Sequence, residues 1–247
     1  MSDGLQALLS NSIARKTIMG VTGTMLMGFA VLHLIGNIQL LFPDGGAAFN
    51  QYGAMLHSLG EFFYLMEIGL FGSILVHAYM GVMVTRQSAD ARPIGYAVDA
   101  DAGGPSMKNK ASMNMIRTGA ILFAFLVVHL YSIRFGEPWV IADSKALAGT
   151  LLAQNHPDML DLAGLTITLF QNPLYVLFYV VCMAALGAHL RHGFWSAFQS
   201  LGLNHPKFMP AIQASAVGVA AVLAVGFLLL PVWVFLDPLG LYTELVR

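Results

Sequence analysis

Charged residues are scarce in this chain. Of its 247 residues, 10% are Asp, Glu, Lys or Arg, whereas 57% are apolar and the mean hydropathy is +0.70. A soluble domain carries about a quarter charged residues, so the composition argues against an ordinary water-soluble domain and predicts a membrane protein. The 12 basic and 13 acidic residues nearly balance, which gives no reason to expect nucleic-acid binding.

Cysteine is nearly absent as well. Cys182 is the single one, which excludes an internal disulfide and a Cys-x-x-Cys-His site for covalent haem attachment. The sequence also lacks an alternating strand pattern and a repeat of solenoid period. No secretory signal is evident, because the first apolar run is too long and has no small-x-small cleavage site. We therefore expect an all-α membrane bundle that forms one domain over residues 1–247.

Five apolar runs are long enough to cross a bilayer, which takes about 20 residues for a core roughly 30 Å thick. The expected spans are 17–42, 62–85, 113–133, 173–198 and 210–236. The turn 43–46 ends the first run, and Pro173 suits a first helical turn. Pro231 predicts a kink in the last span, and residues 143–170 are expected to contain one or two short helices.

Basic residues indicate how the bundle is oriented, because cytoplasmic loops of membrane proteins carry an excess of Lys and Arg. A cytoplasmic N-terminus places most of them inside, namely Arg15, Lys16, Arg86, Arg92, Lys108, Lys110, Arg117, Arg191 and Lys207. Arg134, Lys145 and Arg247 then lie outside. We expect a multi-pass protein with its N-terminus in the cytoplasm and its C-terminus outside.

Histidine occurs in each of the first four spans and not in the fifth. The residues are His33, His77, His129 and His189, with His192 beside the last. An ionisable residue inside a bilayer is costly and is a functional candidate by default. For any one of them, a structural hydrogen bond between helices is the competing interpretation.

The depths of the first and third histidines agree. His33 follows the inner flank Lys16 by 17 residues, which is about 25 Å of helix. His129 lies five residues before the outer Arg134. Both are therefore expected in the outer half of the membrane.

The other two histidines agree at a different depth. His77 follows Glu61 by 16 residues, and His189 follows Pro173 by 16, so each lies about 24 Å from the outer surface. Four histidines thus sort into two pairs, each from two different helices, and coincidental packing does not predict this sorting. Two bis-histidine haems b require this arrangement, because each porphyrin lies between two facing imidazoles. His192 remains an alternative to His189.

Smaller residues near His77 and His189 give weaker signals. Gly81 and Gly193 each follow a histidine by one turn, where a macrocycle needs room, although glycine also serves close packing in membrane helices. Ser73 lies one turn before His77 and could accept its second ring N–H. The alternative is that Ser73 bonds its own backbone.

Three stretches carry a resemblance to a known family. They are Lys16-Thr-Ile-Met-Gly-Val-Thr-Gly23 leading to His33-Leu-Ile-Gly-Asn37; Glu67 leading to His77-Ala-Tyr-Met-Gly81; and His189-Leu-Arg-His-Gly-Phe-Trp-Ser-Ala-Phe-Gln-Ser-Leu-Gly202. The chain resembles the cytochrome b558-type membrane subunit of succinate dehydrogenase (succinate:quinone oxidoreductase, respiratory complex II of the tricarboxylic acid cycle) in its five-helix, diheme form. The resemblance covers nearly the whole chain, least in 87–110 and 142–161.

The resemblance implies specific roles. His33 and His129 would hold the distal haem, and His77 and His189, rather than His192, the proximal haem nearer the cytoplasm. A separate FAD flavoprotein and a separate iron–sulfur subunit would oxidise succinate on the cytoplasmic side of a prokaryotic inner membrane. Electrons would pass through both haems to a quinone, which the resemblance indicates is menaquinone. This chain would then anchor the complex and conduct electrons, without catalytic residues for succinate, and the complexes could form oligomers.

One position departs from the family pattern. Some fumarate-reducing relatives carry a glutamate two residues before the last histidine, which carries protons through the membrane. This chain has Gly187 there, so the resemblance does not extend to that proton path.

Glu67 is the only clear acid within a predicted span. It lies six residues from Glu61, about 9 Å deep and close to the level of His33 and His129. Quinone reduction takes up protons, so Glu67 is a candidate quinone-site residue. The competing interpretations are a structural bond to another helix and a carboxyl that stays protonated.

Other assignments remain open. Diheme b subunits of hydrogenases or formate dehydrogenases have a similar helical plan, although the 189–202 segment argues against them. A haem-free small transporter would need a pair of broken helices, which the sequence does not show. The iron–sulfur subunit is expected to dock on the inner surface, on the N-terminal segment, the loop 87–110 and the connection 191–207, because these carry most of the basic residues.

Overall fold

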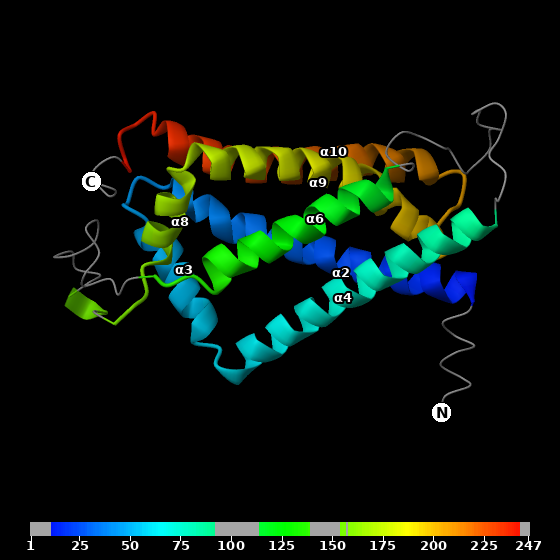
Figure 1. The fold of residues 1–247 in the computed structure, drawn as a ribbon, viewed down its shortest axis with the longest axis horizontal. Coiled ribbons are helices and arrows are strands. Elements are labelled where there is room, and N and C mark those ends of the chain that lie inside the picture. Colours follow the sequence, from blue (N-terminus) through cyan, green and yellow to red (C-terminus); the bar gives the residue numbers. More distant parts are fainter. Residues whose placement is uncertain (1–10, 92–113, 139–153, 157, 243–247) are drawn as a thin grey trace. The chain divides into compact units, whose positions relative to one another are not determined.

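The computed structural model describes residues 11–91, 114–138, 154–156 and 158–242 (Figure 1). Within these ranges all regular elements are helices. Five of them are long and apolar enough to cross a membrane: Ser12–Leu41, Glu61–Asp90, Met115–Arg134, Pro173–Ser200 and Met209–Leu236. The predicted helical fold class and the multi-pass membrane character are therefore confirmed.

The first two long helices extend beyond the predicted spans. Helix α2 (Ser12–Ile38) begins at Ser12 rather than at residue 17 and continues into the 3-10 turn η1 (Gln39–Leu41). Asn11 caps it, because its side-chain oxygen accepts the N–H of Ile13 at 2.8 Å. Helix α4 (Glu61–Asp90) continues past residue 85 to Asp90. Hydropathy marks where a helix leaves the apolar layer, not where its backbone hydrogen bonds end.

The remaining long helices agree closely with the sequence. Helix α6 (Met115–His129) runs into η2 (Leu130–Arg134), a π-helical turn; residues 92–113, with the start of the predicted third span, lie outside the described part. Helix α9 (Pro173–Ser200) begins at its proline, as predicted, and Asn172 caps it by accepting the N–H of Leu174 at 2.9 Å. Helix α10 (Met209–Leu236) continues through Pro231, and the kink there stays a prediction.

Two short helices, α3 (Ala47–His57) and α8 (Leu162–Phe170), lie side by side (Figure 1). Helix α8 falls in the stretch 143–170, where a short helix was expected, whereas α3 was not predicted. Its start depends on Asp44, whose carboxylate accepts the N–H of Gly46 at 3.0 Å and of Ala48 at 2.9 Å. Gly46 has a φ of 86°, which suits glycine.

A buried polar link joins these two helices. Asn50 donates to the Asp161 carboxylate at 2.8 Å and accepts the N–H of Ala163 at 2.9 Å. Asp161 also caps α8 by accepting the N–H of Gly164 at 2.8 Å. Both polar side chains are buried, and these hydrogen bonds satisfy groups that would otherwise be costly to bury.

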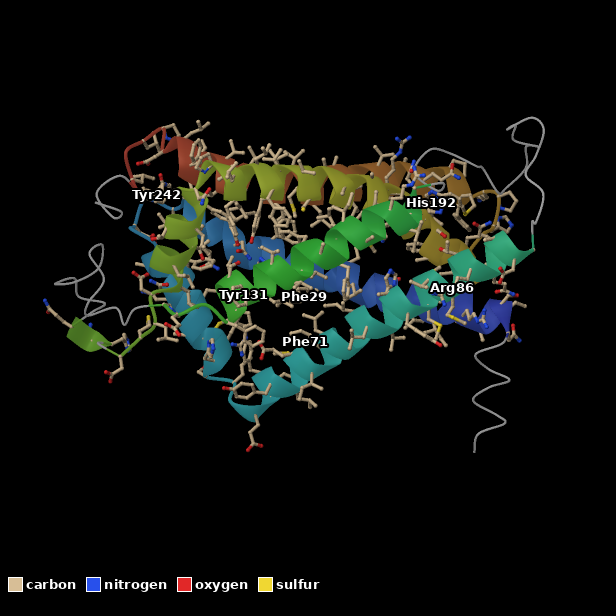
Figure 2. The ribbon with its side chains drawn as sticks, viewed as in Figure 1. Phe29, Phe71, Arg86, Tyr131, His192 and Tyr242 are labelled. Atoms are coloured by element: carbon tan, nitrogen blue, oxygen red, sulfur yellow. The ribbon has the colours of Figure 1, made fainter. Side chains whose placement is uncertain are left out.

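The chain groups into two compact units, each built from parts of all five long helices. One comprises residues 1–29, 68–121 and 185–221, which we call unit 1, and the other, unit 2, comprises residues 30–67, 122–184 and 222–247. The described core of unit 1 includes Trp195, Met209 and Ala216. The core of unit 2 includes Tyr242, whose hydroxyl donates to the Leu40 carbonyl at 2.8 Å (Figure 2).

Candidate functional site

The four span histidines lie two in each unit. His33 on α2 and His129 at the end of α6 belong to unit 2. His77 on α4 and His189 on α9 belong to unit 1. These are the same two pairs that the depths along the spans predicted, and each pair joins two different helices.

The imidazole rings of each pair are separated by a distance that one metal ion would require. The ring centroids of His33 and His129 lie 5.9 Å apart, and those of His77 and His189 lie 6.4 Å apart. A ring nitrogen binds a metal at about 2 Å, which places the ring centroid about 3 Å from the metal. Two imidazoles on opposite sides of one iron therefore have centroids about 6 Å apart, and the separations of both pairs match this value.

The His77 ring is held through its Nδ1 atom, which lies 3.2 Å from the Thr22 hydroxyl and 3.2 Å from the Met19 carbonyl. Thr22 donates its own proton to the Ile18 carbonyl at 2.8 Å. The Nδ1–H of His77 is therefore the donor toward Thr22, and Nε2 is left as the ligand atom. Ser73, the partner suggested by the sequence, bonds its own backbone at Gly69, as the alternative interpretation had it.

His189 is held in the same way. Its Nδ1 lies 3.1 Å from the Thr118 hydroxyl, which donates to the Asn114 carbonyl at 3.1 Å. This again makes Nδ1–H the donor and frees Nε2. Neither Thr22 nor Thr118 was predicted from the sequence. The available signal was that each is followed by glycine, in the dipeptides 22–23 and 118–119.

His129 is anchored by a chain of hydroxyl groups. Its Nδ1 lies 2.9 Å from the Tyr179 hydroxyl, which lies 3.0 Å from that of Tyr175. The Tyr175 hydroxyl lies 2.6 Å from Ser132, and Ser132 donates to the Val128 carbonyl at 2.7 Å. Because the chain ends on a carbonyl, every hydroxyl proton points away from His129, and Tyr179 accepts the Nδ1–H.

Aromatic rings restrict the orientation of the histidines in unit 2. The Phe125 ring stacks on His129 with centroids 5.4 Å apart and an interplanar angle of 25°. The Phe227 ring lies 5.9 Å from that of His33. These ring contacts limit the rotation of both imidazoles, and the hydroxyl chain further fixes that of His129.

Glycine lies against both histidines of unit 1. A Cβ atom placed on Gly23 would lie 3.0 Å from Cε1 of His77, and one on Gly119 would lie 3.5 Å from Cε1 of His189. A Cβ on Gly81 would meet no described atom within 4 Å. A Cβ on Gly193 would lie 3.9 Å from Cε of Met115, an ordinary contact. Close packing is thus not seen at either glycine, and room for a macrocycle stays a prediction.

These distances predict graded effects of alanine at the two glycines. Gly23→Ala should displace the His77 ring, because 3.0 Å is shorter than an ordinary contact, whereas Gly119→Ala, at 3.5 Å, fits without displacement. We expect Gly23→Ala to lose haem from the pair His77 and His189, and Gly119→Ala to retain it. Haem content by the pyridine-haemochrome assay checks this. Gly218→Ala, where a Cβ meets nothing within 4 Å, is the control, and equal haem loss in both variants would contradict the prediction.

His192 has different surroundings from His189. The ring of His192, which Figure 2 labels, contacts Trp195 edge-on. The two ring centroids lie 4.9 Å apart. The buried Nδ1 of His192 has no hydrogen-bond partner among the described residues. A ligand imidazole normally has its second nitrogen held by a partner, so the geometry favours His189 over His192.

Glu67 forms an ion pair with Arg134. Nε of Arg134 lies 2.6 Å from one carboxylate oxygen and its second nitrogen lies 2.9 Å from the other, which is a bidentate arrangement. Both residues belong to unit 2. The interpretation of Glu67 as bonded to another helix is thus supported, and its role at a quinone site stays a prediction.

The described residues contain no group of three or more His, Cys, Asp and Glu side chains that could hold a metal ion; the histidines of the site converge as pairs. Comparisons with protein-family models, with curated proteins and with solved structures found no match to this chain.

Proposed function

We propose that this chain is a diheme cytochrome b that anchors a succinate:quinone oxidoreductase in a prokaryotic cytoplasmic membrane and conducts electrons to quinone. The observation that carries the proposal is the spacing of two imidazole pairs, 5.9 and 6.4 Å, drawn from four membrane-spanning helices. Succinate as the electron donor rests on the resemblance, above all on the segment 189–202.

The four histidines would be the axial ligands. His33 and His129 would hold the distal haem b, and His77 and His189 the proximal one. When bound, a haem b supplies reversible one-electron redox chemistry of its iron. Hydrogen bonds at Nδ1 fix the rings of His77, His129 and His189, and His33 lies beside the Phe227 ring. Fixing the ligands lowers the rearrangement that accompanies each electron transfer.

The proposed partners are an FAD flavoprotein and an iron–sulfur subunit on the cytoplasmic side. Their docking surface would comprise the N-terminal segment, the loop 87–110 and the connection 191–207. Of this surface, residues 1–10 and 92–110 lie outside the described part. Two of its segments meet in the structure, because Arg15 donates to the side chain of Gln87 at 3.3 Å.

Quinone, as menaquinone, would be reduced near Glu67 in unit 2, the unit that also contains His33 and His129. A carboxyl group is able to deliver the protons that quinone reduction takes up. In the structure this carboxylate is engaged by Arg134, so a proton-delivering role has to be separated experimentally from a structural one.

The proposal is tested by producing the chain with its neighbouring subunits and purifying it in detergent. We expect a red complex with b-type absorption bands on reduction, two haems per chain, and a co-purifying protein that contains FAD. Two haems without a flavin-containing partner would favour a hydrogenase or formate dehydrogenase subunit instead. A colourless, well-folded protein would overturn the proposal and leave a haem-free transporter as the alternative.

A further inference from the structure

Helices α2 and α6 carry the same short pattern. Thr22-Gly23 precedes His33, and Thr118-Gly119 precedes His129, with eleven residues from threonine to histidine in both cases. Eleven residues are about three helical turns, so within each helix the threonine and the histidine lie on the same side. Each helix thus presents a ligand candidate and, three turns earlier, a hydroxyl group.

The two hydroxyl groups make equivalent contacts on neighbouring helices. Thr22 lies 3.2 Å from Nδ1 of His77 on α4, and Thr118 lies 3.1 Å from Nδ1 of His189 on α9. Each threonine donates its own proton to the backbone carbonyl four residues earlier, at 2.8 and 3.1 Å. The same set of contacts therefore occurs twice in unit 1, once for each ring of one histidine pair.

We propose that Thr22 and Thr118 are positioning residues that raise the ligand strength of His77 and His189. At His77 the Met19 carbonyl lies at the same 3.2 Å from Nδ1, so Thr22 shares the Nδ1–H with it. This inference rests on the proposed haem-binding function. A hydroxyl oxygen that accepts Nδ1–H keeps the proton on that nitrogen and directs the Nε2 lone pair away from it. It also makes the imidazole a stronger electron donor, which stabilises ferric iron and lowers the reduction potential of the haem.

The bond that each threonine makes to its own helix strengthens this effect. A hydroxyl that already donates to a carbonyl is polarised and becomes a better acceptor. By itself, however, this backbone bond is common for threonine in membrane helices. Thr24 illustrates it, because it donates to the Gly20 carbonyl at 2.9 Å and makes no hydrogen bond to a histidine of the described residues. The contact to an imidazole distinguishes Thr22 from Thr24.

The experiment is a redox titration of both haems in the intact, purified complex. Thr22→Val and Thr118→Val keep the side-chain shape but remove the hydroxyl group. We expect each variant to raise the midpoint potential of the same haem and to leave the potential of the other haem unchanged. In the double variant the two increases should add. Thr22→Ser and Thr118→Ser should restore the wild-type potential. Thr24→Val, with the same backbone bond on the same helix, should change neither potential.

The outcomes separate the inference from the proposed function. Unchanged potentials in both valine variants, with two haems retained, would overturn the inference, as would serine variants that behave like valine. If a valine variant loses one haem altogether, the serine variant at the same position decides. A serine variant that retains this haem supports the role of the hydroxyl, and one that also loses it refutes that role. A wild-type complex without haem would instead refute the proposed function.

Discussion

Replacing His189 with alanine should leave the purified complex with one haem instead of two, whereas His192→Ala should retain both. His189 faces His77 at 6.4 Å and has its Nδ1 held by Thr118. His192 faces Trp195, and its Nδ1 has no partner among the described residues. Loss of an axial ligand removes one of the two bonds that hold the iron of a non-covalent haem, and alanine supplies no replacement.

The measurement is the haem-to-protein ratio by pyridine haemochrome, combined with reduced-minus-oxidised spectra that resolve the two centres. His77→Ala should lose the same haem as His189→Ala, and His33→Ala or His129→Ala should lose the other one. This pairing is more stringent than the count alone. Two haems in His189→Ala, or loss of the same haem from His33→Ala and His77→Ala, would refute the ligand assignment.

The spans and the histidine pairs were accessible from sequence because helix rise is regular. The number of residues from a flanking charge to His33 or His77 gives its depth, and depth alone assigned the partners. The threonines were not accessible in this way. Whether Thr22 meets His77 depends on the rotation of one helix relative to its neighbour, and no pattern in a single helix specifies that rotation.

Two further features show the same limit. Helix α3 was missed because its link to α8, through Asn50 and Asp161, joins residues distant in sequence. Arg134 was not identified as the partner of Glu67 because the two residues lie on different helices, 67 positions apart. The sequence raised a bond from Glu67 to another helix and did not specify the side chain that completes it. The sequence located both charges near the ends of their spans and interpreted them separately.

Glu67→Gln should destabilise the complex because it leaves the Arg134 guanidinium without its carboxylate partner. The pair is part-buried, with side-chain exposures of 36% for Arg134 and 22% for Glu67, and a charge without its partner is costly within an apolar membrane layer. Replacing both residues removes the unpaired charge. We therefore expect Glu67→Gln and Arg134→Gln each to lower thermal stability and haem retention. The double variant, which has two neutral amides at these positions, should recover most of both. The measurement is the temperature at which the haem absorption is lost, compared across the three variants.

The same double variant decides whether Glu67 also acts on quinone. Succinate oxidation is measured with an artificial acceptor, which receives electrons before the quinone site, and with quinone. If Glu67 delivers protons, the double variant should be stable and oxidise succinate normally with the artificial acceptor, while quinone reduction collapses. Arg134→Gln keeps the carboxyl group, so the haem-loaded fraction of that variant should still reduce quinone. Full quinone activity in the double variant would remove Glu67 from the quinone chemistry and assign it to the ion pair alone.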